Sequence, residues 1–183
     1  MSEVFELISN TALELGAYKA AVIPVSEVVT DPKFREMCSS NACGMYGRCW
    51  TCPPDVGEVD ELVSRIATYS YVLVYQTVTE LEDSFDFEGM IEAGNRHNEL
   101  TVKLIEALAD KPMSRRLHLT AGGCKICPKC AKIDSEPCRF PERALSSLEA
   151  YCINVSELAK SAGMKYINGQ DTVTYFGGVF FDL

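Results

Sequence analysis

The sequence lacks the long apolar segments and the targeting signals that mark membrane and secreted proteins. Its longest uninterrupted apolar stretches, such as 71–75, have five or six residues, whereas a membrane-spanning helix needs about 20. The chain begins Met-Ser-Glu, without the positive charge and the apolar run of a secretory signal peptide. We therefore expect a cytoplasmic protein with no membrane partner.

Basic residues and histidines are also few. Lys and Arg total 17 against 26 Asp and Glu, which gives a formal net charge of −9. This acidic balance argues against nucleic acid as a partner, because nucleic-acid binding depends on neutralising phosphates. The glycine fingerprints of nucleotide-binding loops are missing as well. The two histidines, His97 and His118, fall in a predicted helix and a predicted strand, where we expect packed or surface residues rather than metal ligands.

Cysteine, by contrast, is abundant, with nine residues in 183. An odd number of cysteines in a chain long enough to form a real core argues against a secreted disulfide scaffold. Eight of the nine fall into two groups, and Cys152 stands apart on a predicted apolar helix face, where we expect a buried core residue. The first group is Cys38, Cys43, Cys49 and Cys52, and the second group is Cys124, Cys127, Cys130 and Cys138.

Alternating helical and strand patterns predict a single α/β domain over residues 1–183. The expected fold has a mixed, mostly parallel sheet, flanking helices and a C-terminal β-hairpin around Asn168-Gly169. Two cysteine-rich metal-binding loops, 35–56 and 121–141, each follow a predicted strand. Since ligands bind at the carboxyl ends of strands in open α/β sheets, we expect both loops at the same edge of the sheet. The predicted helices are 3–15, 58–68, 87–109 and 146–160, and the predicted strands are 18–25, 71–78 and 116–120.

The spacing of the second group is the most specific pattern in the chain. Cys124-x2-Cys127-x2-Cys130 wraps three thiolates around one corner of a cubane, and Cys138 supplies the fourth ligand, as in ferredoxin-like [4Fe-4S] sites. The alternative is structural zinc, which usually pairs two CxxC knuckles and would leave a third cysteine in series spare. Residues 125–143 hold five basic and three acidic residues, and such cations would stabilise an anionic cluster. A merely solvated surface is the alternative reading of this charge.

The first group has the looser spacing Cys38-x4-Cys43-x5-Cys49-x2-Cys52 and is not a ferredoxin pattern. Four thiolates suffice for a second cubane or for one tetrahedral zinc ion. Three thiolates and an open iron would instead form a substrate-binding cluster that acts as a Lewis acid. A redox dithiol at Cys49 and Cys52 is less favoured, because the following Pro53-Pro54 forces an extended chain where a helix is expected.

Both groups, with their neighbours, resemble the family of predicted metal-binding proteins called domain of unknown function 2284. In the first group the similar string is 43–54, Cys-Gly-Met-Tyr-Gly-Arg-Cys-Trp-Thr-Cys-Pro-Pro, which contains the CPP motif. The second group agrees through its CxxCxxC string, through Cys-Arg-Phe-Pro-Glu at 138–142 and through Ser-Leu-Glu-Ala-Tyr at 147–151. The resemblance covers nearly the whole chain and implies a small cytoplasmic iron–sulfur protein of mostly anaerobic microbes.

This family is named for its cysteines and not for an activity. In the family pattern, the positions that match Cys38, Cys43 and Cys52 are consistently cysteine. The position that matches Cys49 is less consistently cysteine. Cys152 stands where the pattern favours a small residue such as glycine. If Cys49 is not a ligand, the hypothesis of an open iron gains support.

Three functions remain open from the sequence. The first hypothesis is a protein that carries two [4Fe-4S] clusters and passes electrons to or from a larger redox enzyme, its partner protein. The second is an enzyme whose first cluster has an open iron for sulfur transfer or reductive chemistry. The third is a zinc-stabilised interaction module. In the first hypothesis the second group holds one cluster, and Cys38, Cys43, Cys52 and Cys49 hold the other.

Overall fold

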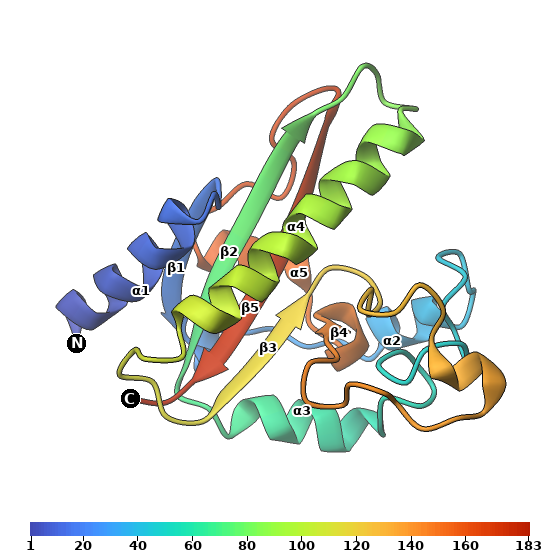
Figure 1. The fold of residues 1–183 in the computed structure, drawn as a ribbon. Helices are drawn as coiled ribbons and strands as arrows, with labels where there is room; N and C mark the ends of the chain where they lie inside the picture. Colours follow the sequence, from blue (N-terminus) through green and yellow to red (C-terminus); the bar gives the residue numbers. More distant parts are fainter.

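A computed structural model describes residues 1–183 as one α/β domain, with a five-stranded mixed sheet covered by helices on both faces (Figure 1). None of its helices combines the length and the apolar composition that a membrane span requires. Along the sheet the strands follow the order β1 (Lys19–Pro24), β2 (Tyr71–Glu80), β5 (Thr172–Phe181), β3 (Arg116–Thr120) and β4 (Ser146–Ser147).

Strand β2 occupies the centre of the fold because both of its faces are apolar. Val72 and Val74 pack into a core with α3 (Val59–Ala67) and α5 (Val155–Ser161). Leu73 and Tyr75 face the opposite core, which α1 (Ser2–Glu14) and α4 (Phe87–Ala107) cover. An uninterrupted apolar run that is buried on both faces is typical of a central strand, and the strand predicted at 71–78 is confirmed.

The prediction of a mostly parallel sheet is wrong. The pairs β1–β2, β2–β5 and β5–β3 are antiparallel, and only β3 and β4 pair in parallel. The alternation of strands and helices suggested crossover connections, but the connection from β1 to β2 returns to the end of the sheet from which it left. Pro24, the last residue of β1, consequently pairs with Tyr71, the first residue of β2.

The predicted C-terminal hairpin is also absent. Strand β5 is a single ten-residue strand that pairs with β2 along its whole length and with β3 on its other side. The Asn168-Gly169 turn leads into this strand, and Asn168 donates hydrogen bonds from Nδ2 to the Lys165 carbonyl oxygen (3.0 Å) and to Thr174 Oγ1 (3.0 Å). Of the two apolar runs that flank Asn168-Gly169, only the second forms a strand.

The helix predicted at 146–160 begins later than expected. Ser146 and Ser147 form β4 against the end of β3, and a 3₁₀ helix, η3 (Glu149–Tyr151), follows. Cys152 then adopts a left-handed conformation (φ 61°), which ends the helical turn. Helix α5 starts after Asn154, whose side chain accepts a hydrogen bond from the Glu157 N–H (3.1 Å) and so caps the helix.

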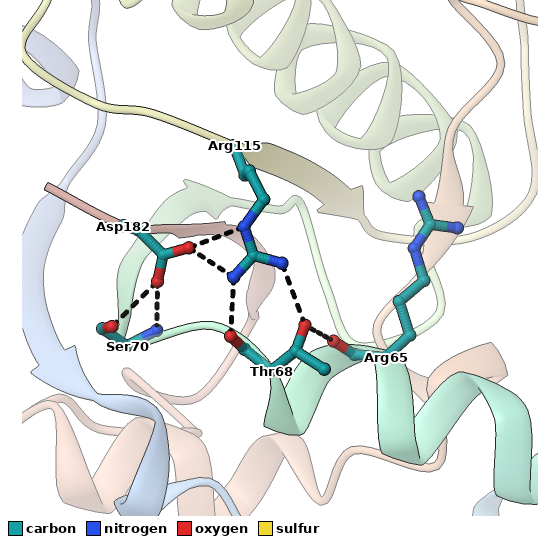
Figure 2. Close-up of polar contacts among 5 residues, drawn as sticks. All are labelled: Arg65, Thr68, Ser70, Arg115 and Asp182. Atoms are coloured by element: carbon teal, nitrogen blue, oxygen red, sulfur yellow. Dashed lines mark hydrogen bonds and ion pairs between the residues drawn. The ribbon is translucent and has the colours of Figure 1, made fainter.

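A polar network fastens the end of the sheet to the helical layer (Figure 2). The Arg115 guanidinium donates to Asp182 (2.8 Å from Nε) and to the Thr68 carbonyl oxygen (2.7 Å). Asp182 also accepts hydrogen bonds from the N–H (2.9 Å) and the hydroxyl (2.8 Å) of Ser70. Thr68 ends α3, so this network joins α3, the start of β2 and the residue after β5.

Candidate metal centre

The two cysteine-rich loops lie side by side at one end of the molecule (Figure 1). We call residues 35–56 the first loop and residues 121–141 the second loop. Lys132 of the second loop forms an ion pair with Asp55 of the first. The Trp50 indole Nε1–H donates to the Glu136 carbonyl oxygen (2.9 Å). The Lys132 ammonium also lies over the Trp50 ring, 4.2 Å from its centroid. These contacts hold the two loops together.

The loops meet for a reason different from the expected one. The end of β1 and the end of β3 lie at opposite ends of the sheet, because β1 and β3 run in opposite directions. The chain after β1 instead runs back along the molecule, where Thr30 forms a β-bridge with Ile153. Helix α2 (Lys33–Cys38) then packs against η3, and Arg35 donates hydrogen bonds to the carbonyl oxygens of Gly57 (2.6 Å) and Ala150 (3.3 Å).

The second cysteine group surrounds one small cavity. Its four cysteines line this cavity together with apolar side chains and Arg139, and no carboxylate or imidazole takes part. All four are partly buried and free of disulfides. A donor set made only of sulfur fits soft metal centres, namely tetrahedral zinc or an iron–sulfur cluster. The lining cysteines are Cys124, Cys127, Cys130 and Cys138.

The thiols of the first group interact electrostatically. Cys49 and Cys52 are buried, Cys38 is partly buried, and Cys43 is exposed. Burial, followed by the charge of Cys43, raises the pKa of the Cys38 thiol. The pKa of Cys52 is raised by its hydrogen bond to Cys49, by burial, and by the charges of Cys49, Cys43 and Cys38. The pKa values of Cys38 and Cys52 are therefore raised in part by the charges of their neighbours in the group.

Cys49 is the one thiol of this group whose pKa is lowered. A hydrogen bond from the Cys52 thiol lowers the pKa of Cys49 to about 5, against the opposing effect of burial. The Thr51 hydroxyl, whose oxygen lies 3.3 Å from Cys49 Sγ, and the backbone of Thr51 and Cys124 lower this pKa further. Because the thiolate is the form in which cysteine binds metal, the low pKa makes Cys49 well suited to act as a ligand.

No group of three or more His, Cys, Asp or Glu side chains stands in a metal-binding arrangement in this structure. The fit to a metal rests on the sulfur-only lining of the second cavity and on the proximity of the four thiols in the first loop. The eight cysteines stay predicted ligands. Two of the basic residues of 125–143 form ion pairs: Lys129 pairs with Asp134 within the second loop, and Lys132 pairs with Asp55 of the first loop.

The two histidines and Cys152 are packing residues. His97 is fully buried, bonds through Nδ1 to Thr77 Oγ1 (3.0 Å) and stacks on Tyr75. Burial lowers the pKa of His97 to about 4, and burial followed by the charge of Arg116 does the same for His118. Cys152 is fully buried, as expected. Its left-handed backbone (φ 61°) gives the physical reason why a glycine would suit this position.

Sequence reasoning missed the residues that join the loops. Asp55 and Glu136 carry no motif, and Glu136 contributes only its backbone carbonyl oxygen. The indole of Trp50 also forms part of the contact between the loops. A contact between segments some eighty residues apart leaves no local pattern by which it could have been found.

Comparison with known proteins supports the metal centre at the level of the family. A family model described as "Predicted metal-binding protein (DUF2284)" matches residues 21–181, which include both loops. No curated protein and no solved structure gives a significant match to the chain. The resemblance seen in the cysteine motifs is therefore confirmed, and the chain belongs to the DUF2284 family of predicted metal-binding proteins.

Proposed function

We propose that this protein holds two [4Fe-4S] clusters and passes electrons to or from a larger redox enzyme. The second group, Cys124, Cys127, Cys130 and Cys138, would hold one cluster. Cys38, Cys43, Cys49 and Cys52 would hold the other. Such clusters supply one-electron redox chemistry at potentials that the surrounding hydrogen bonds and charges set. The protein residues bind the clusters, limit their contact with water and set these potentials.

The observation that carries this proposal is the direct contact between the two groups. The backbone of Cys124 contributes to the lowered pKa of Cys49, so a residue of the second group lies near a thiol of the first. A Cβ atom at Gly123 would lie only 3.1 Å from Cys52 Sγ, so the backbone of the second loop passes against the first group. Because electron transfer slows steeply with distance, two centres in such contact are suited to exchange electrons.

The exposure of the first group suits exchange with a partner. Cys43 is exposed, whereas Cys49 is 1% exposed and Cys52 is 9% exposed. A cluster held by all four cysteines would therefore reach the surface on the Cys43 side. The opposite side would be shielded by the second loop, through which electrons would pass to the other cluster.

The position of Cys49 favours electron transfer over an open iron. Cys49 is buried, and the neighbouring Cys52 thiol lowers its pKa, which favours the thiolate form. A buried thiolate within the group is a natural fourth ligand, and a fourth ligand closes the iron that an enzyme of the second type would leave open. The zinc hypothesis shares the same sulfur donors, so the test must identify the metal.

The first experiment is metal and sulfide analysis of anaerobically purified protein. Two cubanes require about eight irons and about eight inorganic sulfides per chain. About four irons would leave only one group as a cluster site. Zinc without sulfide would overturn the proposal and leave the interaction module.

The second experiment tests the contact between the clusters. The reduced protein should give a spin-resonance spectrum broadened by magnetic coupling between two neighbouring clusters. Cys127→Ser should remove the second cluster and leave the simple spectrum of a single one, and Cys43→Ser should do the reverse. Cys152→Ala, at a buried cysteine outside both groups, is the matched control and should keep the coupled spectrum. An uncoupled spectrum from a protein with eight irons would contradict the proposed electron exchange.

A further inference from the structure

A second and larger cavity lies beside the second loop. Its volume is about 540 Å³, and it opens between α4 and the residues that follow β3. Cavities of roughly 300–1,000 Å³ are typical of sites for small organic molecules. Cys124 and Ile126 line both this cavity and the small cavity of the second cysteine group, so the two share a wall.

The charge of this cavity is opposite to that of the protein. Lys103, Lys125 and Arg143 line it, against a single carboxylate, Glu99. The chain as a whole carries a formal net charge of −9. Three cations gathered at one cavity in an acidic protein create a local site for negative charge.

These three cations also lack acidic partners. Lys103, Lys125 and Arg143 form no ion pair, although the nearby Lys129 and Lys132 each pair with an aspartate. Lys129 and Lys132 are thus engaged with aspartates of the loops, whereas Lys103, Lys125 and Arg143 line the cavity without an acidic partner. Charge-assisted hydrogen bonds to a bound anion would provide the missing partners.

Polar side chains on rigid elements complete the site. Asn98 of α4 donates to the Gly94 carbonyl oxygen (2.9 Å) and accepts from the buried Thr120 hydroxyl (3.2 Å). Asn95, one turn earlier, accepts a hydrogen bond from Lys125 (3.1 Å), which places that ammonium over the cavity. The apolar part of the wall includes Val102 and Leu145.

We propose that this cavity binds a small organic anion. Its carboxylate or phosphate group would contact Lys103, Lys125 and Arg143, and its carbon skeleton would lie against Val102 and Leu145. The bound molecule would lie next to Cys124 and hence beside the second cysteine group. This inference does not depend on which metal the cysteines hold.

Titration calorimetry of the anaerobically purified full chain tests the site. The probes are inorganic phosphate, phenyl phosphate and phenylacetate, each at the same ionic strength set with chloride. Saturable binding of phenyl phosphate or phenylacetate at millimolar concentrations supports the proposal, and the tighter of the two identifies the anionic group. If neither phenyl compound binds, or if inorganic phosphate binds as tightly as both, the organic-anion site is overturned.

Variants separate the cavity from general electrostatics. The double variant Lys103→Gln/Arg143→Gln should weaken binding about tenfold, since two exposed charge pairs are lost. Val102→Trp should abolish binding by filling the cavity without changing its charge. Lys165→Gln, at an exposed lysine away from the cavity, is the matched control and should bind as the parent does. Equal binding by all variants would overturn the proposal.

Metal analysis of each variant separates this proposal from the proposed function. Loss of binding at full metal content is assigned to the cavity alone. If the cations serve only to balance the charge of a metal centre, Lys125→Gln should lower its reduction potential while the probes bind neither this variant nor the parent. That outcome would overturn the anion site and leave the metal centre untouched.

Discussion

Replacement of Lys132 tests how much its side chain contributes to holding the two cysteine loops together. Lys132 pairs with Asp55 across the loops, and the side chains of the two residues are only 23% and 18% exposed. Its ammonium also lies 4.2 Å from the centroid of the Trp50 ring. A partly buried ion pair contributes about 1 kcal/mol, and a partly desolvated cation–π contact contributes about 1 kcal/mol more. Lys132→Gln should therefore destabilise the fold by about 2 kcal/mol.

The chain offers a matched control in Lys129. This residue forms an ion pair of the same chemistry with Asp134, but the pair lies within the second loop and its side chains are 56% and 45% exposed. Exposed pairs contribute little, so Lys129→Gln should cost less than about 0.5 kcal/mol. The comparison isolates burial and the link between the loops from the removal of a lysine charge as such.

Urea unfolding followed by tryptophan fluorescence is the assay. Trp50 is the only tryptophan and lies within the contact itself, so its emission reports both local separation of the loops and global unfolding. Measurements on the reduced, chelated chain and on the metal-loaded chain separate the contribution of the protein from that of the metal. A double-mutant cycle with Asp55→Asn should give a coupling energy of about 1 kcal/mol. If Lys132→Gln costs no more than Lys129→Gln, the proposed role of Lys132 is refuted.

Three further outcomes are expected. Gln76 is fully buried, and neither side-chain amide atom has a hydrogen-bond partner. Gln76→Leu should therefore raise the free energy of unfolding by about 1–2 kcal/mol. A lower free energy of unfolding, measured by urea unfolding, would contradict this. Desolvation pushes the pKa of Asp182 upward, but the hydrogen bonds from Ser70 and Arg115 outweigh it and hold the pKa below its usual value. The stability from Asp182 is therefore complete above the unfolded pKa of about 4 and declines as the pH falls through the folded pKa. Asp182→Asn should cost about 1 kcal/mol at neutral pH and flatten the acid limb of a stability-versus-pH curve. In the metal-free chain, Cys52→Ala should move the pKa of Cys49 from about 5 toward about 8.5. Ultraviolet absorbance of the thiolate during a pH titration measures this pKa. An unchanged midpoint would show that Cys52 is not the cause of the low pKa.

The local patterns of the sequence predicted the helices and the central strand well. Predicted helices 3–15, 58–68 and 87–109 correspond to α1, α3 and α4, and the predicted strand 71–78 corresponds to β2. These elements carry their period in consecutive residues, which is why periodicity alone finds them. Ser146 and Ser147 show the opposite case, because they form β4 only through pairing with the distant end of β3.

The direction of the strands and the contacts of the site could not be read from the sequence for the same reason. Strand pairing depends on segments far apart in the chain, and no local signal states whether a connection crosses the sheet or returns. The cysteine motifs are local, so the resemblance to the family could be recognised from them, and the family match confirms that resemblance. Asn95 and Lys103, by contrast, look like ordinary surface residues of a helix until α4 packs beside the second loop.

The separation of the two loops along the chain bears on how the protein matures. Each cysteine group spans 15 residues, whereas the hydrogen bond from Trp50 to Glu136 joins residues 86 positions apart. The segment between them includes β2, α4 and β3, so the loops can meet only after much of the sheet has formed. A short cysteine segment needs no folded sheet to capture metal. Under the proposed function, metal loading of each loop and alignment of the two loops would therefore be separate events, and the alignment would wait for the sheet.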